Sequence, residues 1–341
     1  MAVLPPDIMG KRILKAVRIT FGAADNGYTL GEDSIEFHVG LPELGEEPSE
    51  LRFDGSFAII AAIEATLVVA TDSGGVLFGF LCGDPAASLS EQSKSLYGNL
   101  FKMLGHHHLI RIWNIVPRIH DIEAGEPRYW AFNRTRQEAF KRHFGEAAWH
   151  SKLPAASGVG GDATQPACLF FIATSDPPRY YENPRQIPAY RYPDQHGPAA
   201  PAFARAAAGS NRGSTPPAIF ISGTAAVVGH KSVGSNELDT QLETTRKNLA
   251  ALSDALGFEG FLQPAGPTHR IFVVYIRRPE HLARVRSYLK EHLAADGDGT
   301  IFLLADICRP ELEVEIEATL LPANFNTSGN LNLNPPIIPI P

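Results

Sequence analysis

Cysteine is scarce in this sequence. The 341 residues include only Cys82, Cys168 and Cys308, which lie far apart in the chain. An odd number of widely spaced cysteines excludes a disulfide framework and a paired-cysteine metal site. Free thiols are typical of the reducing cytoplasm, so we predict a cytoplasmic protein.

Long apolar runs are also absent. No stretch approaches the ~18 apolar residues that a membrane-spanning helix needs. The first 15 residues lack the apolar segment of a signal peptide. We therefore expect neither secretion nor a membrane partner.

A surplus of positive charge is missing too. The chain has 30 Lys and Arg against 37 Asp and Glu, a formal net charge of −7. Nucleic-acid-binding proteins usually carry a basic surplus, so no nucleic-acid partner is predicted. An anionic small molecule could bind only where several arginines gather.

What the sequence does contain is a pattern that occurs twice. The order strand, helix, strand, helix, strand is predicted for the first copy over residues 76–82, 88–104, 109–116, 127–144 and 167–173. It recurs with a fourth strand over residues 218–228, 236–256, 270–276, 279–293, 300–307 and 312–320. Ser88 or Ser90 is predicted to cap the first helix, and Asn236 the third. The repetition predicts an α+β protein of two related units, with mixed sheets and helices packed on one face.

The chain is predicted to divide into an N-terminal unit, a strap, a C-terminal unit and a mobile tail, over residues 1–174, 175–217, 218–323 and 324–341. The N-terminal unit has extra strands at 13–21 and 35–39, and a strand pair or one buried strand at 59–70. The strap is rich in proline but also holds four tyrosines and Phe203. A solvated linker rarely keeps so many aromatic residues, so we predict an ordered strap over the junction of the two units.

Four glutamates alternate with other residues near the end of the C-terminal unit: Glu311, Glu313, Glu315 and Glu317. On a strand they would share one face. Spacing alone favours a solvent-exposed sheet face. The alternative is that one glutamate lies in a cleft, where partial burial lets a carboxyl group hold a proton near neutral pH.

Four arginines are candidates for an anion site. Arg136 lies in the second predicted helix, Arg205 in the strap, and Arg277 and Arg309 at strand ends. Any one of them taken alone is typical of a surface residue. Because an arginine fork grips a carboxylate with two hydrogen bonds, their spread over three segments is what a dicarboxylate site between units needs.

Other motifs predict no chemistry. Residues 158–163 loosely fit a dinucleotide-binding glycine motif, but no strand is predicted before them and Pro166 blocks a following helix. His106–His108 has no acidic neighbour, and consecutive strand residues point opposite ways, so a metal site is not predicted. Cys308 at a strand end is typical of a small buried apolar residue.

Several segments resemble known families. The C-terminal unit resembles the reactive-intermediate deaminase (Rid) superfamily in residues 219–225, 229–230, 241 and 314–318. Further stretches, which extend the match from about Val76 to Ala318, resemble the chorismatases: residues 111–114, 129–136, 192–206 and 306–309.

This resemblance implies two Rid-like (chorismate-mutase-like) units with the active site in the cleft that they form. Glu315 matches a glutamate that protonates the enolpyruvyl methylene of chorismate. Arg136, Tyr192 and Arg205 match residues that hold carboxylates. No metal and no organic cofactor are implied.

The resemblance also implies a product. In the hydrolytic branch of the family, two pocket positions look like alanine, whereas this chain has Gly223 and Cys308 there. That pair implies conversion of chorismate to 3-hydroxybenzoate and pyruvate, with the ring hydroxyl as internal nucleophile. The alternatives are a hydrolytic chorismatase that makes a dihydroxycyclohexadiene carboxylate, a Rid-type imine deaminase, and a non-catalytic ligand-binding module. We expect a monomer, because an internal duplication can replace a subunit contact.

Overall fold

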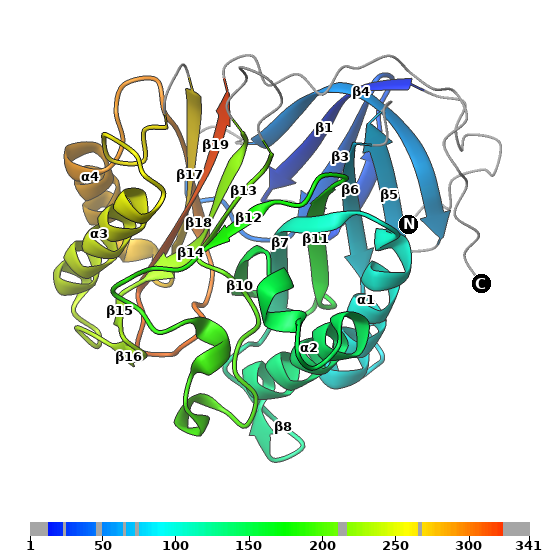
Figure 1. The fold of residues 1–341 in the computed structure, drawn as a ribbon. Coiled ribbons are helices and arrows are strands. Elements are labelled where there is room, and N and C mark those ends of the chain that lie inside the picture. Colours follow the sequence, from blue (N-terminus) through cyan, green and yellow to red (C-terminus); the bar gives the residue numbers. More distant parts are fainter. Residues whose placement is uncertain are drawn as a thin grey trace.

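The computed structural model describes residues 13–22, 25–45, 50–63, 66–71, 75–210, 217–264 and 268–322. Within these residues, two large sheets form the centre of the molecule, and four α-helices lie outside them (Figure 1). No helix in the described ranges is long and apolar enough to cross a membrane.

The larger sheet has nine strands in the order β10-β7-β11-β6-β5-β4-β1-β3-β2. The five strands on the β2 side of this sheet are β1 (Ile13–Phe21), β2 (Gly27–Leu30), β3 (Ser34–Val39), β4 (Glu50–Ile63) and β5 (Thr66–Thr71). The other four are β6 (Val76–Cys82), β7 (His108–Pro117), β10 (Ala155–Gly161) and β11 (Cys168–Thr174). The predicted strand pair at 59–70 corresponds to β4 and β5, and the short β2 was not predicted.

The smaller sheet has six strands in the order β12-β13-β14-β19-β17-β18. Its strands are β12 (Arg179–Tyr181), β13 (Ala206–Ala208), β14 (Ile219–Ala225), β17 (Thr268–Ile276), β18 (Gly299–Leu304) and β19 (Val314–Pro322). Two short ribbons complete the strands: β8 (Ile122–Glu123) with β9 (Glu126–Pro127), and β15 (Val227–Val228) with β16 (Lys231–Ser232).

The two units have the same strand connectivity. In the first, β7 pairs parallel with β10 and antiparallel with β11, which pairs antiparallel with β6. In the second, β17 pairs parallel with β18 and antiparallel with β19, which pairs antiparallel with β14. Each unit has two helices after its first and second strands: α1 (Leu89–Leu104) and α2 (Arg128–Phe144), then α3 (Leu238–Ala255) and α4 (Leu282–His292). The predicted α+β class with two related units is confirmed.

The sequence interpretation missed strand β10. Residues 155–161 include three glycines, which have low strand propensity, and we expected no strand there. Tertiary contact explains two of the glycines: a Cβ at Gly160 would lie only 2.6 Å from the Cβ of Asp306, and one at Gly161 only 2.5 Å from Cγ2 of Ile115. The glycine run ends in a turn that leads to β11, not in the helix that a dinucleotide-binding motif requires.

Helix starts were predicted with mixed success. Of the two predicted caps for α1, Ser88 is the one that caps it, in a full capping box with Glu91. Asn236 does not cap α3: that helix begins at Leu238, and Asn236 has φ +60° in the turn before it. Asparagine is suited to both positions, since it caps helices and also tolerates left-handed backbone, so the residue type alone could not decide.

The apolar core has three parts. One cluster lies between the sheets and draws residues from both, including Phe80 and Phe170 of the larger sheet and Phe220 and Tyr275 of the smaller. A second cluster packs α1 and α2 against the outer face of the larger sheet, and a third packs α3 and α4 against the smaller. Each sheet therefore has its helices on one face and the partner sheet on the other.

The predicted strap is ordered in its described residues, 175–210 and 217. Strands β12 and β13 join the edge of the smaller sheet, while the Tyr180 hydroxyl donates a hydrogen bond to the carbonyl of Leu109 in the larger one. In Figure 1 the rest of this segment loops below the sheets, beside β15 and α2. The predicted mobile tail, residues 324–341, lies outside the described residues.

Candidate active site

A cavity of about 380 Å³ lies where the two units and the strap meet. The first unit lines it with residues after β7, on α2 and on β10, namely Ile119, His120, Pro127, Tyr129, Trp130, Phe132, Arg136, Ala156, Ser157 and Gly158. The strap adds Gln186, Tyr192, Gln195, His196, Pro201, Phe203 and Arg205. The second unit adds Gly223, Ala225, Val227, Cys308, Arg309, Pro310, Glu311 and Glu315. All six residues that the resemblance singled out thus border one cavity, and so does Arg309. The prediction for Arg277 is wrong: it does not line the cavity and pairs with Asp306 at 3.4 Å.

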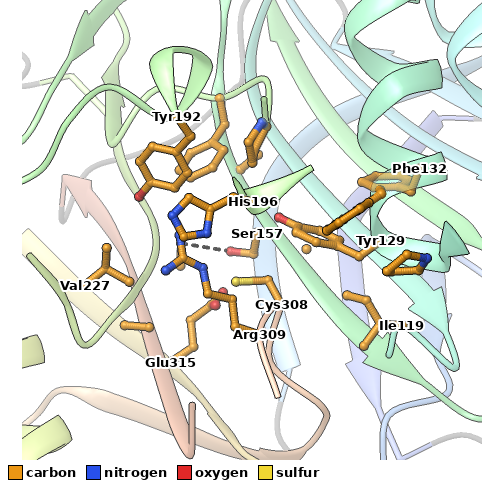
Figure 2. A pocket seen from close by; sticks show the side chains of 18 of the residues that line it. Ile119, Tyr129, Phe132, Ser157, Tyr192, His196, Val227, Cys308, Arg309 and Glu315 are labelled. Atoms are coloured by element: carbon orange, nitrogen blue, oxygen red, sulfur yellow. Dashed lines mark hydrogen bonds between the residues drawn. The ribbon is translucent and has the colours of Figure 1, made fainter. Parts of the chain in front are cut away.

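Glu315 lies on β19 with its carboxyl group at the cavity wall (Figure 2). Its side chain is only 4% exposed. Burial is the main cause that raises its pKa to about 8, and the neighbouring charge of Glu317 adds to the effect. Arg111 and Arg205 act in the opposite direction. The carboxyl group is therefore mostly protonated at neutral pH and can donate a proton.

The solvent-exposed face that spacing favoured for the four glutamates is wrong. Glu313, Glu315 and Glu317 are all buried. Glu317 is paired with Arg111 of the larger sheet, and Glu313, just before β19, is paired with Arg278. Glu311 lies before the strand, at the cavity mouth, where it accepts a hydrogen bond from Ser232. Alternation along a strand shows which side chains share a face, but not what covers it.

Gly223 makes room for the Glu315 carboxyl group. A Cβ at position 223 would lie 1.8 Å from Oε1 of Glu315, far inside any contact distance. The side chain of Glu315 fills the space that the missing Gly223 side chain leaves. Any larger residue at 223 must displace that carboxyl group.

Cys308 lies beside Glu315 at the cavity wall (Figure 2). Burial, with Glu315 as the next cause, raises the pKa of its thiol to about 12. The group is a neutral thiol at physiological pH, hence a weak hydrogen-bond donor and not an anionic nucleophile.

Arg136 and Arg205 are buried cations without acidic partners. Neither forms an ion pair with a carboxylate in the described ranges, and Nε and Nη2 of Arg136 and Nε of Arg205 have no hydrogen-bond partner there. Arg205 donates to the Tyr192 hydroxyl at 2.8 Å and to the carbonyl of Ile187 at 3.2 Å. Because an unpaired buried charge is costly, these groups are suited to an anionic ligand.

Three further residues at the cavity lie outside the six that the resemblance singled out; among them, only Arg309 was already an anion-site candidate. Tyr129 of α2 faces Cys308 and Glu315, and both raise the pKa of its phenol after burial does. Arg309 donates to Ser232 and to the carbonyl of His230, and its guanidinium lies 5.4 Å from the Tyr192 ring centroid. The His196 ring is 3.0 Å from that of His230 at the cavity mouth. For Tyr129 the available signal was the resemblance, whose quoted stretches contain it, whereas Arg309 was also predicted from the spread of arginines.

The fold and the cavity have the features of an enzyme site for a small anionic molecule: a protonated carboxyl group and unpaired arginines face a cavity that several aromatic side chains line. No group of three or more His, Cys, Asp and Glu side chains arranged to hold a metal ion occurs among the described residues.

Comparison with known proteins identifies the family. A family model described as chorismatase FkbO/Hyg5-like, N-terminal, matches residues 58–173. The chain is 33% identical over 246 residues to a 3-hydroxybenzoate synthase of Streptomyces hygroscopicus, with 70% of this chain and 71% of that protein covered. It is 31% identical over 253 residues to a chorismatase of Streptomyces rapamycinicus, with 72% and 74% covered. A crystal structure of a chorismatase matches with a TM-score of 0.76 and 25% identity, covering 90% of this chain and 92% of that one. The chain belongs to the chorismatase family.

Proposed function

We propose that the enzyme converts chorismate to 3-hydroxybenzoate and pyruvate. The observation that carries this proposal is the raised pKa of Glu315, about 8, at the wall of a cavity that also holds two unpaired arginines. Chorismate is an enol ether with two carboxylates. Its cleavage needs an acid, and its binding needs cationic side chains for the carboxylates. The 3-hydroxybenzoate synthase relative, at 33% identity, supports the choice of product.

Binding rests on Arg136, Arg205 and Tyr192. Arg136 lies on the first-unit wall and Arg205 in the strap, so the two cations approach the cavity from different segments. We assign one substrate carboxylate to each arginine. Tyr192 accepts a hydrogen bond from Arg205 and fixes the direction of its guanidinium. Holding both ends of the substrate places the enolpyruvyl group for reaction.

Proton transfer starts the reaction. Glu315 gives its proton to the methylene carbon, and the positive charge that develops is shared by the enol carbon and the ether oxygen. The bond between ring carbon and ether oxygen then breaks, its electron pair leaves with pyruvate, and the adjacent ring hydroxyl forms a new bond to that carbon. The hydroxyl proton returns to the Glu315 carboxylate. Opening of the resulting epoxide and loss of a ring proton give 3-hydroxybenzoate, so no water is consumed.

Exclusion of water favours this internal attack. Aromatic and aliphatic side chains line much of the cavity, among them Tyr129, Trp130, Phe132 and Phe203. A water beside the protonated enol ether would instead attack it and release a diol. The neutral thiol of Cys308 can donate a weak hydrogen bond to the epoxide oxygen as the ring opens.

The test is incubation of the purified enzyme with chorismate, followed by enzymatic assay of pyruvate and chromatography of the aromatic product. We expect equal amounts of pyruvate and 3-hydroxybenzoate. Release of pyruvate with the dihydroxycyclohexadiene carboxylate alone would overturn the product assignment. Chorismate that stays intact would overturn the proposed function.

We further propose a cytoplasmic monomer that binds no nucleic acid. Both units and the strap contribute to the cavity, which agrees with an internal duplication that replaces a subunit contact. Cys82, Cys168 and Cys308 are free thiols, which agrees with a reducing compartment. Light scattering during gel filtration should give the mass of one 37.0 kDa chain.

A further inference from the structure

A buried ion pair lies directly behind the candidate acid. Glu317 of β19 and Arg111 of β7 are each only 1% exposed and are hydrogen-bonded to one another across the two sheets. Glu317 also accepts hydrogen bonds from Trp113 at 2.6 Å, from Tyr275 at 3.1 Å and from the Ser157 hydroxyl. Four donors, one of them a guanidinium, thus converge on its carboxylate.

This ion pair is connected to Glu315 in two ways. First, Glu315 and Glu317 are two residues apart on one strand, so they lie on the same face of β19. Second, the Ser157 hydroxyl accepts hydrogen bonds from Arg111 at 2.8 Å and from the backbone N–H of Gly223 at 3.0 Å. Gly223 is the residue whose missing side chain leaves room for the Glu315 carboxyl group.

We propose that Glu317, Arg111 and Ser157 are positioning residues that keep Glu315 seated against Gly223 and in its proton-donating form. The inference rests on the proposed function of Glu315 as the acid. The negative charge of Glu317 disfavours ionisation of the neighbouring Glu315 carboxyl group. Ser157 fixes the backbone of Gly223, which sets where the Glu315 carboxyl group lies.

Stability alone does not account for a charged pair at this place. Removing two charges from water usually costs about as much as their attraction returns, and apolar residues of similar volume are often at least as stabilising. The first unit shows the apolar solution: strand β11, which corresponds to β19, contributes Phe170 and Ile172 to the cluster between the sheets. The charged pair occurs in the unit that carries Glu315.

Several charged or titratable groups act on Glu315. Glu317 on its own strand raises the pKa, while Arg111 on β7 and Arg205 in the strap lower it. Cys308 and Tyr129 also face it and stay neutral, since the pKa of each is raised. Neutralising Glu317 removes the negative charge that raises the pKa of Glu315. It also leaves the positive charge of Arg111, which lowers that pKa, without its counter-charge. Both changes therefore lower the pKa of Glu315.

The experiment is the pH dependence of kcat/KM for Glu317→Gln, with Glu313→Gln as the matched control. Glu313 is also buried and ion-paired, with Arg278 at 3.0 Å, but it is not among the groups that shift the pKa of Glu315. We expect the alkaline limb of Glu317→Gln to move down by roughly one pH unit, and that of Glu313→Gln to stay in place. An unshifted alkaline limb in folded Glu317→Gln would overturn the inference. A merely structural role of Glu317 would lower the stability of the protein but would not shift this limb.

Ser157→Ala provides a second test that keeps both charges of the pair. We expect roughly a tenfold lower kcat with little change in KM, the lower end of what misplacing an acid costs. A wild-type kcat in this variant would also overturn the inference, including in the case where Glu317→Gln fails to fold.

A measurement without turnover separates this inference from the proposed function. In protein labelled with carbon-13 at glutamate carboxyl groups, the Glu315 signal is assigned by its loss in Glu315→Gln and then titrated by NMR. If the wild type titrates near 8 but leaves chorismate intact, the proposed function fails while the inference stands. Equal titration midpoints in wild type and Glu317→Gln would sink the inference alone.

Discussion

The two units share one topology but differ at the strand that faces the cavity. Strand β11 of the first unit places Cys168, Phe170 and Ile172 in the cluster between the sheets. Strand β19 of the second unit places Glu315 and Glu317 on its inner face instead. Both strands pack helices on their outer face with ordinary apolar residues. The outer faces of the two strands are therefore alike, and the strands differ at their inner positions, which carry carboxyl groups only in β19.

The second helices of the units differ in the same way. In the first unit, α2 has 17 residues and contributes Tyr129, Phe132 and Arg136 to the cavity. In the second, α4 has 11 residues, buries Val285, Tyr288 and Leu289 against its own sheet, and contributes nothing to the cavity. The two units have the same fold but contribute different groups to the proposed site. The acid, Glu315, comes from the second unit, and Arg136, a cation for a substrate carboxylate, comes from the first.

The largest effect should come from removing the acid of the second unit. Glu315→Gln keeps the shape of the side chain but has no proton to give, so pyruvate release from chorismate should fall on the order of 10²- to 10⁴-fold. Circular dichroism should show an unchanged fold. If turnover stays near normal, Glu315 is not the acid and the contrast between β11 and β19 is structural only.

The next effect should come from the strap. Arg205→Ala should weaken chorismate binding by on the order of 2–5 kcal/mol, because it removes a buried partner of a substrate carboxylate. The measurement is KM, or a dissociation constant for the inactive Glu315→Gln background. Arg191→Ala is the control, since Arg191 is an exposed cation in the same segment that does not line the cavity. An unchanged KM in Arg205→Ala would remove the strap from the binding site.

A smaller effect is expected from pH. The raised pKa of Glu315 means that the proton is present below about 8 and is lost as pH rises through that value. The ratio kcat/KM should therefore be level on the acid side and fall tenfold per unit above about 8. Glu182 has a pKa raised to about 7 by burial and lies near Arg205, so Glu182→Gln is the control. If the alkaline limb of kcat/KM disappears in Glu182→Gln, the group that titrates is Glu182 in the strap and not Glu315.

The last expected effect is a change in product, together with a lower rate because the acid is displaced, and it comes from Gly223→Ala combined with Cys308→Ala. The new methyl group at 223 displaces the Glu315 carboxyl group toward the cavity, and the shorter side chain at 308 leaves room for water. The double variant should stay folded and release pyruvate. Its second product should shift from 3-hydroxybenzoate toward the dihydroxycyclohexadiene carboxylate. Chromatography decides this, and an unchanged product ratio would show that these positions do not control the nucleophile.

Local sequence signals were sufficient where short-range physics decides structure. The capping box at Ser88, the glycine after α1 and the proline before α2 bound helices that the structure contains. They failed where a distant segment decides. Strand β10 forms despite its glycines because β7 pairs with it. Cys82 and Cys168 are far apart in sequence, yet they are register partners across β6 and β11.

The sequence by itself determined the α+β class, the duplication and, through a resemblance, the six candidate site residues. Apolar periodicity, caps and turns act over a few residues, so they are visible in the chain. Only the tertiary structure decided that Glu315 is buried and protonated, that its carboxyl group occupies the space left by Gly223, and that Arg111 lies behind it paired with Glu317. The physical reason is that burial and electrostatic coupling depend on which distant segments cover a strand face, and alternation along one strand carries no information about its cover.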